Sequence, residues 1–93
     1  MLLDSQGQKI DHDVSSTLDA RGLSCPLPLL KTKLALNDME VGQVLHVKAT
    51  DAGSQRDIQR FAELSGHELI DAKTLDDEFH YWLRKRERGN PQA

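Results

Sequence analysis

A chain of 93 residues is long enough for one small domain, and a domain of that size buries only roughly 60 to 65% of the surface that its unfolded chain exposes. The 12 basic and 15 acidic residues give a formal net charge of −3, which argues against a surface devoted to nucleic acid or anionic membrane. A single cysteine cannot form an internal disulfide, and no signal region or run of about 18 apolar residues is present, so we expect a protein of the reducing cytoplasm.

The two ends of the chain are predicted to flank the domain. Residues 1–15 mix charges and carry few large apolar side chains, which is typical of a flexible extension. The tail at 87–93 contains Gly89, Asn90 and Pro91, which end regular structure. The folded domain is therefore expected to span residues 16–86.

The first predicted elements are a short strand at 16–20, a loop at 21–24 and a helix at 26–37. Leucines recur through the helix at helical spacing and predict the side that faces the core: Leu27, Leu29, Leu30, Leu34 and Leu36. Lys31 and Lys33 are expected to face solvent.

A strand at 44–50 and a second helix at 54–65 follow. In the segment "VLHVKAT" apolar and polar residues alternate, as in a strand with one buried face. Ser54 and Asp57 resemble a capping box in which Asp replaces the usual Glu, and Gly66 is expected to end the helix. The predicted inner face of this helix consists of Ile58, Phe61, Ala62 and Leu64.

The last two strands are predicted at 67–74 and 79–85, which gives the order β-α-β-α-β-β. Right-handed connections should bring both helices to one face of the sheet, so we expect an α+β fold, a two-layer α/β sandwich with a four-stranded mixed sheet. Alternation assigns Phe79, Tyr81 and Leu83 to one face, and Trp82 to the open face with His46, Lys48 and His80. An exposed Trp82 would mark a contact surface, and the alternative is that it packs against the tail.

The only cysteine lies in the segment "GLSCPLPLLK". Proline is tolerated in the first helical turn, so Pro26 at the first helical position, with Pro28 two residues later, predicts that Cys25 is the N-cap, and Gly22 permits the preceding loop. The helix dipole and free N–H groups of the first turn, those of Leu27 and Leu29, would then lower the pKa of the thiol. Arg21 would add positive charge if the loop folds back, and it is a candidate for partner docking together with Asp51 and Trp82. A buried cysteine that merely fills space is the competing interpretation.

Three motifs in this chain resemble those of the TusA-like, or SirA-like, sulfur-carrier proteins. The segment "LDARGLSCPLPLLKTKLAL" carries a Cys-Pro-x-Pro signature, "ATDAGSQRDIQRF" an Asp-x-Gly-Ser-x-x-Asp-Ile segment, and "SGHEL" the entry to the third strand. The resemblance runs from Leu18 to about Lys85, and the family fold has the same β-α-β-α-β-β order.

The resemblance implies that Cys25 accepts a sulfane sulfur from a cysteine desulfurase or rhodanese-like donor and carries it as a persulfide to an acceptor protein. In some members the sulfur reaches a thiolated tRNA uridine, and in others molybdenum-cofactor enzymes or sulfur oxidation. Such a carrier needs an accessible nucleophile but no acid and base of its own. It is expected to work as a monomer without direct contact to nucleic acid or membrane. No histidine has zinc-ligand spacing, so neither metal nor cofactor is expected.

The remaining candidates have an ordinary structural interpretation beside the functional one. Asp51, next to Gly53, is either a turn-forming carboxylate or a group that docks a partner. Arg56 and Asp57 are interpreted as charges that favour a helix start, and Asp19 as a partner of Arg21. The basic run at 84–88 is interrupted by an acid and is interpreted as a solvated strand end.

Two other classes of function stay open at this point. The domain could be a non-catalytic regulatory binding module that acts through the open sheet face around Trp82, with Cys25 incidental. It could also be a redox sensor that forms an intermolecular disulfide, although the chain has no second cysteine to resolve it.

Overall fold

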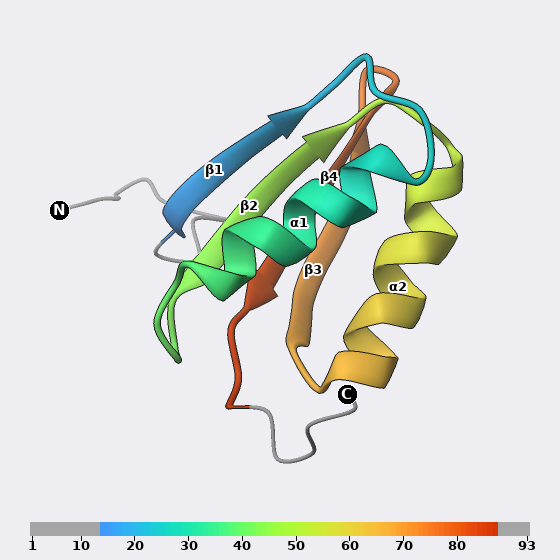
Figure 1. Cartoon of the computed structure of the whole chain (residues 1–93). Coiled ribbons are helices and arrows are strands. Elements are labelled where there is room, and N and C mark those ends of the chain that lie inside the picture. The colour runs from blue at the N-terminus through green and yellow to red at the C-terminus, as the bar shows by residue number, and fades with distance from the viewer. Residues whose placement is uncertain (1–13, 88–93) are drawn as a thin grey trace, which may run out of the picture.

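A computed structural model of the chain describes residues 14–87, which form four strands and two helices in the predicted order (Figure 1). The elements are β1 (Val14–Ala20), α1 (Leu27–Asn37), β2 (Val44–Ala49), α2 (Gly53–Ser65), β3 (Glu68–Leu75) and β4 (Glu78–Arg84). The extension predicted at 1–15 lies outside the described residues as far as residue 13, and so does the predicted tail from residue 88 onward.

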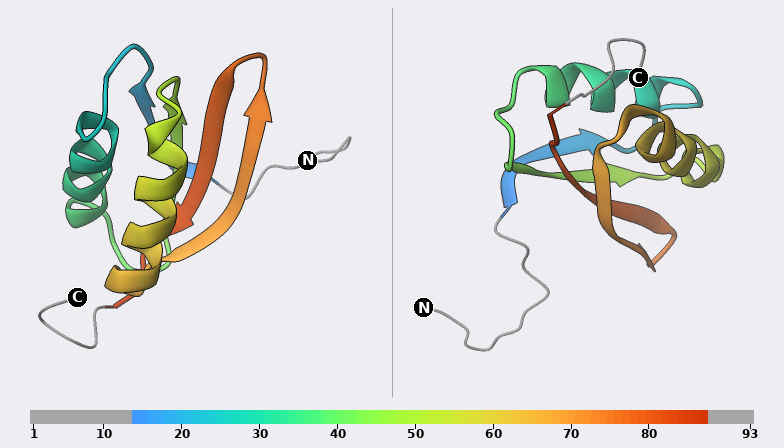
Figure 2. Two further views of the ribbon diagram at one scale, coloured as in Figure 1. Left: turned by 90° about the vertical axis from the view of Figure 1, so that its right-hand side faces the viewer. Right: turned by 90° about the horizontal axis from the view of Figure 1, so that it is seen from below.

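The four strands form one mixed sheet in the order β1-β2-β4-β3. Strands β1 and β2 are parallel and are joined through α1, whereas β4 runs antiparallel to both β2 and β3. Both helices cover the same face of the sheet (Figure 2). The α+β sandwich with its helices on one face is therefore confirmed.

Strand β1 begins at Val14, two residues earlier than predicted. Val14 is paired with Val44 of β2, and the Ser15 hydroxyl accepts a hydrogen bond from the Val44 N–H at 3.3 Å. Pairing with a neighbouring strand satisfies backbone groups whatever the side chains are, so a polar segment can be ordered without an apolar pattern of its own.

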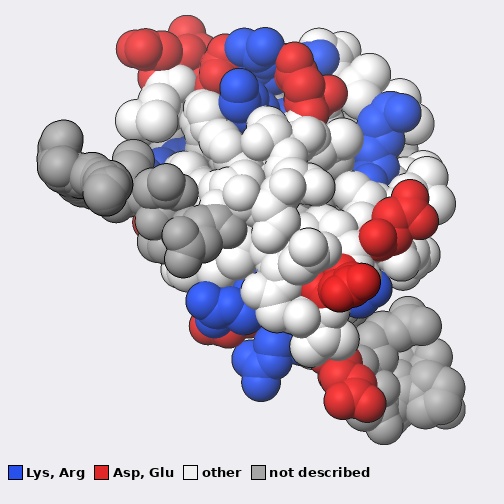
Figure 3. Space-filling model, turned by 90° about the vertical axis from the view of Figure 1, so that its left-hand side faces the viewer, with Lys and Arg blue, Asp and Glu red and all other residues white. Residues whose placement is uncertain are grey.

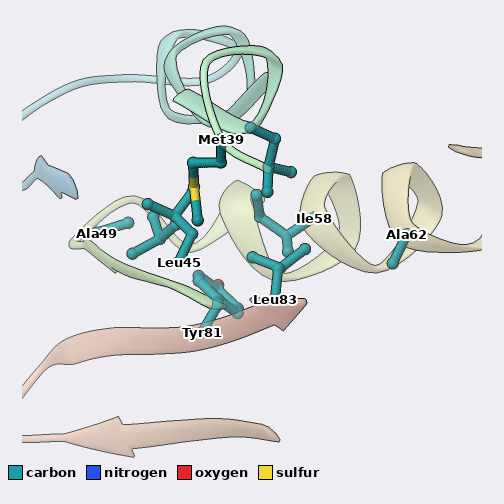
Figure 4. Close-up of a cluster of buried hydrophobic side chains, with 9 residues drawn as sticks. Met39, Leu45, Ala49, Ile58, Ala62, Tyr81 and Leu83 are labelled. Atoms are coloured by element: carbon teal, nitrogen blue, oxygen red, sulfur yellow. The ribbon is translucent and has the colours of Figure 1, made fainter. Parts of the chain in front are cut away.

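The inner face of the sheet is built from directly opposed apolar residues of β2 and β4. Leu45 faces Leu83, and Val47 faces Tyr81. Together with Met39 and Ile58 these side chains fill the space between the sheet and the helices (Figure 4). The predicted alternation of β2 and β4 is thus confirmed.

Helix α1 turns a different side to this core than the leucine spacing predicted. Its buried residues are Pro28, Thr32 and Leu36, whereas Leu27, Leu30 and Leu34 are 44%, 46% and 65% exposed. Thr32 tolerates burial because its hydroxyl donates to the Pro28 carbonyl at 2.8 Å. The prediction was wrong for these three leucines because apolar residues lie on both sides of the helix.

Helix α2 ends before Gly66 as predicted, and Ile58 and Ala62 are buried. Leu64 was expected on the inner face, but it is 69% exposed. Ser54 and Ser65 are buried instead, at positions that share the helical face of Ile58. Small hydroxyl residues fit where α2 approaches the sheet closely, which a search for large apolar residues does not detect.

Trp82 lies on the face of β4 opposite Tyr81 and Leu83, as predicted, but it is only 5% exposed. Its ring stacks on His46 with ring centroids 4.6 Å apart and planes inclined by 6°. The expected exposed tryptophan is therefore wrong, because β4 is an inner strand and stacked neighbours cover part of the ring.

No helix within residues 14–87 combines the length and the apolar character needed to span a membrane.

Candidate functional site

Cys25 lies in the exposed loop between β1 and α1, at the end of the sheet where β1 and β2 finish and both helices start (Figure 1). Helix α1 begins at Leu27, so Pro26 is the N-cap and Pro28 is the second helical residue, and the Cys25–Pro26 peptide bond is cis. The prediction that Cys25 caps α1 was therefore wrong by one residue.

One of the two backbone donors predicted to face the sulfur, the Leu27 N–H, is used elsewhere. The Leu27 N–H donates to the Ser24 carbonyl at 2.8 Å, which closes a turn around the cysteine. The Leu30 N–H donates to the Pro26 carbonyl at 3.0 Å, as in the first turn of a helix. The Leu27 N–H is thus used by the loop itself and is not directed at the sulfur.

The sulfur instead meets the first turns of α2. Cys25 Sγ lies 2.7 Å from Asp57 Oδ2, close enough for the thiol to donate a hydrogen bond to the carboxylate. Gly53, the first residue of α2, leaves room for this approach, because a Cβ at position 53 would lie 3.4 Å from Cys25 Cβ and 2.9 Å from Asp51 Oδ2. The two helix starts therefore enclose the cysteine from two sides.

Two hydrogen bonds hold the start of α2 in this position. The Ser54 hydroxyl pairs with the Tyr81 hydroxyl at 2.7 Å in the buried core, which fastens the first turn of the helix to β4. Asp51 Oδ2 accepts the Gly53 N–H at 3.1 Å and thereby satisfies one free donor of the helix start. Both members of the predicted capping box thus have other partners, since Ser54 bonds to Tyr81 and Asp57 to Cys25.

These surroundings raise the pKa of the Cys25 thiol instead of lowering it. The largest cause is the hydrogen bond to Asp57, followed by loss of hydration and by the negative charges of Asp57 and Asp51. Arg56 opposes these effects only in part. The predicted thiolate at rest is therefore wrong: the sulfur keeps its proton and directs it at Asp57.

The loop before Cys25 is fixed by Arg21 and Gly22. The Arg21 guanidinium forms two hydrogen bonds to Asp19, each 2.9 Å long, and a third to Glu78 at 3.1 Å. The Gly22 N–H donates to Thr50 Oγ1 at 2.9 Å, and Gly22 has a φ of 83°, which favours glycine. Asp19 thus pairs with Arg21 as expected, but Arg21 directs its charge to carboxylates and not to the sulfur.

A second group of polar side chains crosses the open face of the sheet. His46 Nε2 and His80 Nδ1 are 2.9 Å apart, and His80 Nε2 is 3.3 Å from a Glu78 carboxylate oxygen. Burial and the neighbouring His80 lower the pKa of His46. Within residues 14–87 no three His, Cys, Asp or Glu side chains are grouped as a metal site requires.

Of the residues singled out from the sequence, Pro26 and Asp51 lie beside Cys25, Pro28 is buried in the first turn of α1, and Trp82 belongs to the open face. Asp57 was missed as a site residue, because its spacing from Ser54 is also that of a helix cap. The available signal was the Asp-x-Gly-Ser-x-x-Asp-Ile segment, in which both carboxylates near the sulfur flank the glycine that allows close approach.

Replacing Asp57 by Asn should lower the pKa of the Cys25 thiol, because it removes the carboxylate that favours the protonated form. More thiolate is then present at any pH below that pKa, so alkylation by iodoacetamide near neutral pH should become several-fold faster. The measurement is the alkylation rate as a function of pH, and its midpoint should move to lower pH.

Glu63→Gln is the matched control for this substitution, since Glu63 is an exposed acid later in the same helix. It should leave the alkylation profile unchanged. An unchanged or higher midpoint in Asp57→Asn would show that the carboxylate does not control the thiol.

Comparison with known proteins gives the same family from sequence and from structure. Residues 16–85 match the model of the family described as sulfurtransferase TusA. The chain is 49% identical over 73 residues to the sulfur carrier protein TusA of Allochromatium vinosum. The aligned segment covers 78% of this chain and 96% of that protein. The chain is 39% identical over 75 residues to the protein of the same name from Pseudomonas aeruginosa, covering 81% and 95% of the two chains.

A solved structure shows the same arrangement. The crystal structure of a SirA-like protein from Desulfitobacterium hafniense superposes with a TM-score of 0.69 at 28% identity. The superposition covers 77% of this chain and 99% of that one, so the described fold is that of the SirA-like protein throughout its length.

Proposed function

The chain belongs to the TusA sulfurtransferase family, and we propose that it is a sulfur carrier that holds a sulfane sulfur as a persulfide on Cys25. The observation that carries the proposal is the exposed sulfur of the only cysteine, held at the rim of the sheet between the starts of two helices. An accessible thiol is what exchange with another protein's persulfide requires.

In the uptake step a sulfane sulfur moves from one cysteine thiolate, that of the donor, to another, that of Cys25. The Cys25 thiolate attacks the outer sulfur of a donor persulfide, a bond forms between Cys25 Sγ and that sulfur, and the donor S–S bond breaks. The donor cysteine leaves as a thiolate with the electron pair of the broken bond. No external oxidant or reductant is needed, and the delivery step repeats the exchange with Cys25 as the leaving thiolate.

Asp57 receives the proton in this scheme. The thiol must lose its proton before it can attack, and Asp57 Oδ2 lies 2.7 Å from Sγ along the hydrogen bond that already joins them. Asp57 then passes this proton to the departing donor thiolate, so the exchange is neutral in protons overall. Because the pKa of the thiol is raised at rest, the free carrier is protected from small oxidants between transfers.

The partners in this proposal are proteins of two chemical classes. A cysteine desulfurase or rhodanese-like enzyme supplies the sulfane sulfur, and a protein with an accessible thiolate receives it for tRNA thiolation, molybdenum-cofactor enzymes or sulfur oxidation. A thiol that must be free between transfers is suited to the reducing cytoplasm, which we assign as the compartment. The carrier domain, predicted at residues 16–86, is proposed to include Val14 and Ser15 as well, because β1 begins at Val14.

The direct test is the mass of the protein after exposure to inorganic polysulfide. We expect a gain of one sulfur atom, located by peptide mapping to the peptide that contains Cys25 and removed by dithiothreitol. Protein that gains no sulfur, or gains it at another residue, would refute the proposed function.

A further inference from the structure

The exposed side of α1 carries an apolar row that the fold does not use. Leu27, Leu30 and Leu34, called here the leucine stripe, are spaced as i, i+3 and i+7 and lie on the side of the helix opposite its core face. Single exposed leucines are common, but three aligned on one helix form a continuous apolar row, which is a feature of contact sites. The core is complete without them, since Pro28, Thr32 and Leu36 fill the inner side of α1.

The leucine stripe starts beside the reactive sulfur. Leu27 is the first residue of α1, and its N–H donates to the carbonyl of Ser24, so it belongs to the turn that holds Cys25. Any protein that exchanges sulfur with Cys25 must bring its own sulfur into contact with Sγ. A partner surface that extends from Sγ over the first turns of α1 meets the stripe.

Positive charge borders the stripe on both sides. At 100° per residue, Lys31 and Lys33 lie on opposite flanks of the row of leucines, and the 11 residues of α1 include no acid. The Lys33 ammonium lies 5.8 Å from the centre of the Phe61 ring, on the flank that faces α2. Helix α1 therefore carries a net positive charge, although the net charge of the whole chain is −3.

Seen from the side of the β1 edge, the middle of the surface is uncharged, and charged side chains lie at its top, its bottom and its right-hand margin (Figure 3). Apolar contact bordered by charge is the composition of protein docking sites. We propose that the leucine stripe docks the protein sulfur donor of Cys25, through an apolar strip on the donor that is bordered by carboxylates, an inference that rests on the proposed function.

A second copy of this chain fits the stripe less well. Two copies would bring the lysines of one α1 against those of the other, and like charges repel. Three leucines also cover only a small part of the roughly 800 Å² per partner that a stable interface buries. A short-lived contact suits a carrier that must leave its donor.

The test compares two sulfur sources with one set of variants. Leu34→Glu places a negative charge at the most exposed leucine of the stripe, where it repels the carboxylates of the donor. Uptake from a purified cysteine desulfurase supplied with cysteine should therefore slow by about tenfold or more. Uptake from inorganic polysulfide, which needs no docking, should stay at the wild-type rate. Leu64→Glu is the matched control, because Leu64 is 69% exposed in the last turns of α2.

Each other result contradicts the docking proposal. Equal slowing by Leu64→Glu would indicate a general effect of charge, and slowing with polysulfide would indicate damage at Cys25. Wild-type uptake from polysulfide but not from the desulfurase would refute a donor of this class, and a dimer that Leu34→Glu dissociates in sedimentation would assign the stripe to a second copy. Absence of uptake from both sources would refute the proposed function itself.

Discussion

Replacing Cys25 by Ser should abolish sulfur uptake from every donor while the domain remains folded. The chain has no other cysteine, so no second sulfur can accept the transferred atom. A serine hydroxyl does not ionise at neutral pH and forms no persulfide, so no residual activity is expected. The measurement is the intact mass after exposure to polysulfide, compared with wild type under the same conditions.

The fold should tolerate this substitution because the Cys25 side chain is exposed and contributes nothing to the core. The free energy of unfolding should stay within about 0.5 kcal/mol of wild type, as for most surface changes. Ser24→Ala is the control, since it alters the exposed neighbour of Cys25 and should keep full uptake. Sulfur bound covalently to Cys25→Ser would disprove the role of Cys25.

The element order and the mixed four-stranded sheet could be predicted because their signals are local and redundant. Alternation in β2 and β4 assigns each side chain to a face, and the register pairs Leu45 with Leu83 and Val47 with Tyr81 accordingly. Handedness of the connections then leaves few arrangements for two helices. The motifs around Cys25 indicated the family, and they did so independently of this periodicity.

The inner face of α1 could not be predicted, because its sequence offers two apolar sides. Thr32 is buried only because its hydroxyl has a partner one turn earlier, and that bond is visible only after the helix is formed. The leucine spacing therefore pointed to the surface that is left exposed. A rule that treats every apolar row as core overlooks rows that serve contacts with other proteins.

The predicted direction of the pKa shift of Cys25 was wrong for a similar reason. Sequence predicted the field of the helix that follows Cys25, but the nearest charged group comes from the other helix, 32 positions later. A helix start favours an anion only where no carboxylate is closer, and Asp57 is in direct contact with the thiol. The sign of the pKa shift depends on that long-range contact.

Replacing Leu83 by Ala should cost about 3 kcal/mol of unfolding free energy, within the range for a large-to-small change in a packed core. Leu83 is fully buried on β4, opposite Leu45 of β2 and Leu69 of β3, and it packs in the cluster beneath both helices. A small domain has a total stability of only about 5 to 15 kcal/mol, so the loss should move the urea midpoint far below that of wild type.

Leu64→Ala provides the comparison, because it removes the same atoms from a side chain that is 69% exposed and should cost about 0.5 kcal/mol or less. Equal losses in the two variants would contradict the described core. At urea concentrations where Leu83→Ala is still folded, its Cys25 should take up sulfur at the wild-type rate, because Leu83 belongs to the core cluster, which includes no residue of the loop that holds the thiol. Stability and sulfur uptake should thus separate in this variant, whereas in Cys25→Ser only uptake is lost.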